Sequence, residues 1–292
     1  MADWNDIAKQ ICTATGNPFV AKEHRGIGGG SINDAYLIAD DNQKYFVKLN
    51  RSDLVEMFEA EAAGLMEIAN SQSVRVPRPV CHGTSGNHSF IVLEYLELGS
   101  SDSSQELGQQ LAAMHKSTQQ QFGWDRDNTI GSTPQVNTLS DDWIEFYGKH
   151  RLLFQLQLPG AQRYGKQLVA AGEELVENLG VFFDSYHPQA SLLHGDLWGG
   201  NHATTRDGAP VIFDPAVYYG DREADVAMTE LFGGFGRRFY DAYNEAWPLD
   251  PGYGVRKTLY NLYHVLNHLN LFGGGYGDQA YSMIGRLQSE YR

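Results

Sequence analysis

A short polar segment interrupts a part of the sequence that otherwise favours helices. Residues 193–201 have the sequence LHGDLWGGN, and VIFDP follows at 211–215. Short β-favouring segments flank these loops, and Arg-Asp-Gly at 206–208 is typical of a hairpin turn. Because loops on a rigid scaffold often carry binding and catalytic side chains, this island predicts a functional site.

The spacing of Asp196, Asn201 and Asp214 is typical of phosphoryl transfer. In that chemistry one carboxylate accepts the proton of the attacking hydroxyl, while an amide oxygen and a second carboxylate bind Mg²⁺. The catalytic loop of protein kinases has this spacing, although Gly195 here replaces an Arg and Pro215 follows the metal-binding Asp. We therefore predict Asp196 as the catalytic base and Asn201 with Asp214 as the magnesium ligands.

A glycine-rich segment precedes the first predicted strands. Residues 26–36 have the sequence GIGGGSINDAY, and glycines let backbone N–H groups approach a phosphate closely. Such segments are common, so this one gains weight from the residues that follow it. The residues predicted to surround the nucleotide phosphates are Gly28, Gly29, Gly30 and Ser31.

A lysine and a glutamate complete the predicted nucleotide site. Lys48 lies in a strand predicted over 45–49, where an isolated lysine would usually be solvated. Glu61 lies in the middle of a helix predicted over 53–70. Its register among apolar residues favours it over Glu59 as the partner that orients Lys48.

The character of the sequence changes after residue 96. Strands are predicted before that point at 35–39, 45–49 and 89–93, and helices after it at 104–117, 141–158 and 162–179. We predict an α+β, two-lobed protein-kinase-like fold. Residues 1–96 form a small antiparallel β lobe with one main helix that binds nucleotide, and 97–292 form a larger, mainly helical lobe for catalysis and substrate. Adenine is expected to contact the backbone near Glu94 and Leu96.

Composition limits the classes of partner. The chain has 36 acidic and 22 basic residues, a formal net charge of −14, which disfavours nucleic acid and anionic membrane surfaces as partners. Cys12 and Cys81 have no metal-ligand spacing. The first ten residues are polar and no run of 18 apolar residues occurs, so we expect a cytoplasmic protein. The sequence gives no indication of oligomeric state.

Several longer segments resemble the fructosamine kinase family, also called ketosamine kinases. The resemblance extends from about residue 26 to 277 and is carried by GGGSINDAY, FVKLN, MFEAEAAGL, LLHGDLWGGN, DPAVYYGDREADVAMTELFGGF and LYHVLNHLNLFGGGY. Its most specific parts are Trp198 and the YYGDREADVAM run, in which Asp221 stands where many relatives have His. The resemblance implies an ATP- and Mg²⁺-dependent kinase that phosphorylates a sugar hydroxyl, O3 in particular. Its substrates would be ketoamines such as fructosamines or ribulosamines, as small molecules or as glycated lysine on proteins, in a deglycation repair activity.

Further residues have roles that follow from this pattern. Trp198 suits the apolar face of a sugar ring, with packing in the core beneath the loop as the alternative. His194 and Asp225 are expected to support the catalytic loop by hydrogen bonds, Asp225 by accepting backbone N–H groups. Arg222 and Glu223 are candidates for a supporting ion pair, although a surface pair fits equally well.

Other functions fit parts of the pattern. A kinase of an aminoglycoside, choline or homoserine would use the same machinery, and a non-catalytic nucleotide-binding module is a weaker alternative because lysine, base and metal ligands are all present. A metal-dependent hydrolase would leave the glycine-rich segment and the strand lysine without a role. The ligands of such a hydrolase would be His194, Asp196, His202 and Asp214. His264 and His268, one helical turn apart, are better interpreted as core or pocket-wall residues.

Overall fold

The chain forms two compact units. The computed structural model describes residues 2–28 and 32–292, so the predicted phosphate-loop residues Gly29, Gly30 and Ser31 lie outside the described residues. The first unit contains Met1–Ser103 and Ala203–Pro215, and the second contains Ser104–His202 and Ala216–Arg292. The sequence-based division into 1–96 and 97–292 therefore assigns 97–103 and 203–215 differently from these units.

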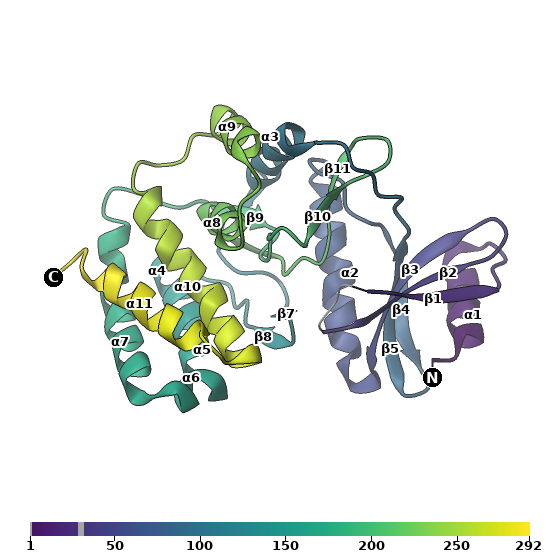
Figure 1. The fold of residues 1–292 in the computed structure, drawn as a ribbon, viewed down its shortest axis with the longest axis horizontal. Helices are drawn as coiled ribbons and strands as arrows, with labels where there is room; N and C mark the ends of the chain where they lie inside the picture. The colour runs from purple at the N-terminus through teal and green to yellow at the C-terminus, as the bar shows by residue number, and fades with distance from the viewer. Residues whose placement is uncertain (1, 29–31) are drawn as a thin grey trace. The chain divides into compact units, whose positions relative to one another are not determined.

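An antiparallel sheet is the centre of the first unit. Its described residues form five strands in the order β1-β2-β3-β5-β4 (Figure 1). The strands are β1 (Glu23–Ile27), β2 (Asp34–Ala39), β3 (Lys44–Arg51), β4 (Pro79–Ser85) and β5 (His88–Glu94), and the helices beside them are α1 (Trp4–Thr15) and α2 (Val55–Asn70). Figure 1 shows α1 and α2 on either side of this sheet. The predicted antiparallel β lobe is thus confirmed, with α1 as a helix in addition to the predicted main one.

Strand alternation decides which residues of β3 face which helix. Val47 and Leu49 belong to a buried core that also contains Ile7 and Ile11 of α1. Lys48, between them, has the opposite orientation and faces α2. Helix α1 has clear ends: the Asp3 side chain accepts two backbone N–H groups at its start, and Gly16 ends it with a φ of 72°.

A hairpin from late in the sequence belongs to the first unit from Ala203 onward. Strands β10 (His202–Thr204) and β11 (Pro210–Ile212) pair around the predicted turn. Isolated β-bridges join Val211 to Arg75 and Thr205 to Leu98, and these attach the hairpin to the rest of the unit. The hairpin leads directly to Asp214, which explains how this residue belongs to the same unit as Lys48.

The second unit is mainly helical, as predicted, around a small sheet of order β12-β9-β6. Its helices are α3 (Ser104–His115), α4 (Trp143–Tyr147), α5 (Phe154–Gln157), α6 (Pro159–Tyr164), α7 (Lys166–Glu177), α8 (Glu223–Leu231), α9 (Arg237–Ala246), α10 (Tyr253–Phe272) and α11 (Tyr276–Gln288). Its strands are β6 (Thr118–Gln119), β7 (Asn128–Ile130), β8 (Thr133–Gln135), β9 (Ala190–Leu193) and β12 (Tyr218–Gly220).

Two long helices predicted from the sequence are interrupted. A π-helical turn at Gly148–Leu153 separates α4 from α5, and Gly165 separates α6 from α7. Within the described part of the chain, none of the helices combines the length and apolar content that crossing a bilayer requires.

Candidate catalytic site

Lys48 is the centre of a buried charge cluster in the first unit. Its Nζ donates hydrogen bonds to Glu61 Oε1 and to Asp214 Oδ1, each at 2.6 Å. The Lys48 and Glu61 side chains are only 6% and 10% exposed, whereas that of Asp214 is 45% exposed. Glu59, the rival partner considered from the sequence, is exposed on the helix surface. The helix register therefore identified the correct partner of Lys48.

The electrostatics of this cluster keep the lysine charged. Burial lowers the pKa of Lys48, but the carboxylates of Asp214 and Glu61 outweigh that effect and raise it above the usual lysine value. Burial raises the pKa of the Glu61 carboxyl, and the Lys48 ammonium acts against that rise. Two carboxylates face one ammonium, so the cluster has an excess of negative charge on its exposed, Asp214 side. A divalent cation suits that side chemically.

Asp214 has an uncommon backbone conformation. Its φ is 59°, in the left-handed region that residues other than glycine rarely occupy. Aspartate tolerates this region better than most residues, and such conformations concentrate at functional sites. The ion pair with Lys48 fixes the side chain that this backbone presents.

The predicted catalytic loop, residues 194–201 of the second unit, follows strand β9. Gly195 has a φ of 81°, and a Cβ on this residue would lie 2.1 Å from the carbonyl oxygen of Ala216. The Ala216 N–H in turn donates to the carbonyl oxygen of His194 at 2.8 Å. This close approach of two backbone segments explains why a glycine, and no larger residue, precedes Asp196.

A buried carboxylate holds the start of this loop. Asp225 of α8 accepts the backbone N–H of His194 through Oδ2 at 2.6 Å and that of Gly195 through Oδ1 at 2.8 Å. The N–H of Asp196 donates to Nδ1 of His194 at 3.3 Å. Burial raises the pKa of Asp225, but its hydrogen bonds, led by the one from His115, outweigh burial and lower it. Asp225 therefore remains an anion that accepts the loop's N–H groups.

Asn201 lies against the proposed base. Its Nδ2 donates to the Asp196 carbonyl oxygen at 2.9 Å and approaches the Asp196 carboxylate at 3.5 Å. Its backbone N–H donates to the carbonyl oxygen of Trp198 at 2.9 Å. These contacts turn the amide nitrogen of Asn201 toward Asp196, and the amide oxygen is the atom that a magnesium ion would take.

Trp198 lies outside the hydrophobic core. Its side chain is 40% exposed, and its ring meets that of Phe232 edge-on at 6.2 Å. The indole lies over Gly200, where a Cβ would come within 2.3 Å of the ring. The alternative of a core tryptophan beneath the loop is therefore wrong, and a large aromatic face lies two residues from Asp196.

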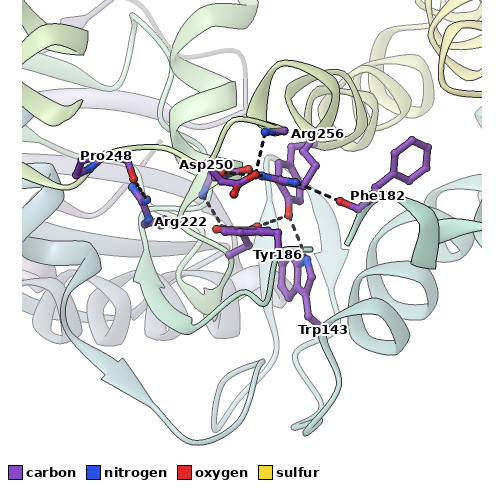
Figure 2. A network of polar contacts seen from close by, with 11 residues as sticks. Trp143, Phe182, Tyr186, Arg222, Pro248, Asp250 and Arg256 are labelled. Atoms are coloured by element: carbon purple, nitrogen blue, oxygen red, sulfur yellow. Dashed lines mark hydrogen bonds and ion pairs between the residues drawn. The ribbon is translucent and has the colours of Figure 1, made fainter. Parts of the chain in front are cut away.

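The candidate ion pair between Arg222 and Glu223 does not form. Glu223 instead pairs with Arg256 at 2.7 Å, and Arg222 donates to the carbonyl oxygen of Trp247. Arg222 also donates to the carbonyl oxygen of Pro248 (Figure 2). The two residues are adjacent at the start of α8, so their side chains diverge and find partners from later in the sequence.

Asp221 is fully buried two residues before Glu223. Its carboxylate accepts from the hydroxyls of Tyr186 and Tyr260 and from the backbone N–H of Glu223. The aspartate that departs from the expected pattern thus accepts from three donors, two of which come from distant parts of the sequence.

The histidines considered as metal ligands have other contacts. The His202 ring packs on Phe235 with centroids 4.1 Å apart, and burial lowers its pKa. His264 is buried, and its carbonyl oxygen accepts from Nδ1 of His268. In residues 2–28 and 32–292, no three His, Cys, Asp or Glu side chains gather to form a metal site. The two histidines lie in helix α10, where the His268 ring packs on Phe232 and Phe272.

Of the residues predicted to surround adenine and phosphate, Gly28, Glu94 and Leu96 are described and lie in the first unit. The Glu94 carboxylate accepts from Arg75 at 3.2 Å, and Leu96 is half-buried beside a cavity of about 460 Å³. The residues that line this cavity are Arg75, Tyr95, Leu96, Glu97, Thr205, Arg206 and Asp207. Gly28 has open space where a Cβ would lie, which suits close approach of a ligand to its backbone.

One partner of the site was missed from the sequence. His115, at the end of α3, contacts Asp225 through Nε2 at 3.1 Å. No local motif surrounds this histidine, so only the folded structure relates it to the catalytic loop.

Several known proteins are similar to this chain over most of its length. A probable ketoamine kinase from Synechocystis is 51% identical over 286 residues, which cover 97% of this chain and 96% of the relative. A chloroplastic protein-ribulosamine 3-kinase from Arabidopsis thaliana is 47% identical, covering 88% of this chain and 80% of the relative. A crystal structure assigned as a fructosamine-3-kinase from Haemophilus somnus has a TM-score of 0.89 at 30% identity and 96% coverage of both chains. The family model for fructosamine kinase matches residues 3–290, and the chain therefore belongs to the fructosamine kinase family.

Proposed function

We propose that this protein is an ATP-dependent kinase that transfers a phosphoryl group to a sugar hydroxyl, O3, of ketoamines. The family and the names of its relatives, ketoamine kinase and protein-ribulosamine 3-kinase, support this substrate class. Glycated lysine on proteins and free ketoamines are both included, and the activity would serve the repair of glycated proteins.

The observation that carries the proposal is the buried Lys48 held between Glu61 and Asp214. A buried ammonium with fixed orientation is suited to bind phosphate oxygens, and Glu61 keeps it in place. The half-exposed Asp214 carboxylate would bind Mg²⁺, as would the Asn201 amide oxygen. Magnesium would neutralise phosphate charge, and the protein's part is to supply oxygen ligands of the kind that this cation prefers.

The proposed roles in the second unit centre on the proton of the acceptor. Asp196 would accept the proton from the attacking sugar hydroxyl, and its backbone is held through His194 and Asp225. The exposed indole of Trp198 would pack on the C–H face of the sugar. Glu94, Leu96 and the segment from Gly28 to Ser31 keep their proposed roles around adenine and phosphates.

An acceptor panel tests this function. ATP consumption would be measured with fructosyl-lysine, ribulosyl-lysine, kanamycin and choline, and ³¹P–¹H correlation NMR would locate the phosphate on the product. We expect turnover with one or both ketoamines and phosphate on O3. Asp196→Asn should lower kcat by roughly 10²- to 10⁴-fold while ATP still binds. Turnover with kanamycin or choline alone would support a different small-molecule kinase, and ATP binding without turnover would support a non-catalytic module.

A further inference from the structure

A continuous chain of hydrogen bonds lies behind the catalytic loop. His115, whose side chain is fully buried, has Nε2 at 3.1 Å from Asp225 Oδ2 and Nδ1 at 2.8 Å from the Tyr243 hydroxyl. The Tyr243 hydroxyl is also 3.0 Å from Nη1 of Arg222. The result is one buried path of hydrogen bonds. It starts at Arg222, just before α8, and passes through Tyr243 of α9 and His115 of α3 to Asp225 of α8.

The chemistry of the two ends of this path, Arg222 and Asp225, sets the direction of its hydrogen bonds. A guanidinium can only donate, so Arg222 donates to the Tyr243 oxygen. The Asp225 carboxylate can only accept, so Nε2 of a neutral His115 donates to it and Nδ1 accepts the Tyr243 hydroxyl proton. A neutral imidazole that accepts at Nδ1 carries its proton on Nε2 and donates there to Asp225.

The far end of the path is firmly held. Arg222 also donates to the carbonyl oxygen of Pro248 at 2.6 Å (Figure 2). It donates to the carbonyl oxygen of Trp247 at 3.0 Å, and its guanidinium lies 4.0 Å from the centre of the Trp247 ring. Arg222 therefore cannot turn away from Tyr243 without losing several contacts. Burial lowers the pKa of His115, which agrees with a neutral ring.

Asp225 links the fixed donor, His115 Nε2–H, to the backbone of the loop before Asp196. Its Oδ2 accepts from both His115 and the backbone N–H of His194, while Oδ1 accepts from the N–H of Gly195. The histidine therefore restricts rotation of the carboxylate about its Cβ–Cγ bond. Without that donor, the same carboxylate could turn and hold the N–H groups before Asp196 less well.

We propose that His115, as the Nε2–H tautomer, is a positioning residue for phosphoryl transfer that acts on Asp196 through Asp225 and the loop backbone. This inference rests on the proposed kinase function, but the tautomer and the rigidity of the loop can be measured without any substrate. A displacement of about 1 Å in a reacting group can cost about 10²-fold in rate.

Substitutions at His115 separate positioning from packing. His115→Leu removes the donor at similar size and should lower kcat about 10²-fold, with KM for ATP little changed. His115→Gln keeps an amide donor near the Nε2 position and should recover most of that kcat. As a matched control, Met114→Ala opens a cavity beside it in α3, and should lower the melting temperature while the folded enzyme keeps its kcat.

Two substrate-free measurements complete the test. ¹⁵N NMR of histidine-labelled protein should report the Nε2–H tautomer for His115, and the Gly195 amide should exchange with solvent faster in His115→Leu than in Met114→Ala. An Nδ1–H tautomer, or a His115→Leu enzyme with normal kcat and normal Gly195 exchange, would overturn the proposal. If these two measurements agree with expectation but wild-type protein phosphorylates no ketoamine, the proposed function fails and the positioning path stands.

Discussion

Gly195→Ala is the substitution that most directly tests the geometry of the catalytic loop. The added Cβ would lie 2.1 Å from the Ala216 carbonyl oxygen, whereas close carbon–oxygen contacts are about 3.3 Å. The two backbone segments must therefore separate by about 1 Å. The φ of 81° adds a conformational cost of about 1–2 kcal/mol for any residue with a Cβ. Because Asp196 is the next residue, a shift of this size should lower kcat about 10²-fold.

Gly199→Ala is the matched control in the same loop. A Cβ at Gly199 meets no atom within 4 Å, and its backbone has no positive φ, so the same chemical change should leave kcat and stability almost unaltered. Turnover of fructosyl-lysine would be measured with a coupled ADP assay, and the free energy of unfolding from urea titration. Our reasoning about the loop is refuted if Gly195→Ala retains wild-type kcat and stability, or if Gly199→Ala is impaired to the same degree.

Three other substitutions test the cluster, the acceptor surface and the buried histidine. Lys48→Met leaves Glu61 buried without its partner and should lower the free energy of unfolding by about 3 kcal/mol in urea titration. A double variant with Glu61→Leu should recover most of that stability but no turnover. Because Trp198 is 40% exposed, Trp198→Ala should raise KM for the ketoamine with little change in melting temperature; a clear loss of stability with normal KM would contradict this. Burial lowers the pKa of His264 to about 3, so its contribution to stability is complete above the unfolded value near 6.5 and is lost as pH falls toward 3. From pH 7.5 to 5 this loss should be about 2 kcal/mol, and His264→Phe should flatten the stability profile over that range, whereas an unchanged profile would argue against a neutral buried ring.

Elements with a local signal were predictable from the sequence. The antiparallel strands and the helix of the first unit followed from alternation and from turn residues, and the pairing of Lys48 with Glu61 followed from helix register. Asp196, Asn201 and Asp214 were singled out because their spacing matches that of the residues that serve phosphoryl transfer in kinases. Their roles stay predictions until the variants are measured.

Contacts between distant segments gave no comparable signal. His115 and Asp225 are 110 residues apart, and nothing near either one indicates that they meet. Arg256 approaches Glu223 from 33 residues away and displaces the adjacent Arg222 as its partner. Arg222 is the neighbour of Glu223 in the sequence, but the packing of the helices brings Arg256 to the buried Glu223 carboxylate.

Two parts of the predicted catalytic loop are suited to two different tasks of a kinase: holding the base and contacting the acceptor. Its backbone up to Asp196 is fixed by Asp225, by the Ala216 contact and by a glycine that permits no Cβ, so the proposed base can hold one position in every turnover. Trp198, two residues later, is 40% exposed, and its ring contacts that of Phe232. From its proposed role we expect a change at Trp198 to alter which acceptor binds while the position of Asp196 is maintained. On this basis we expect substrate preference in such enzymes to vary through residues around the indole, and loss of kcat to follow from changes in the segment that Asp225 holds.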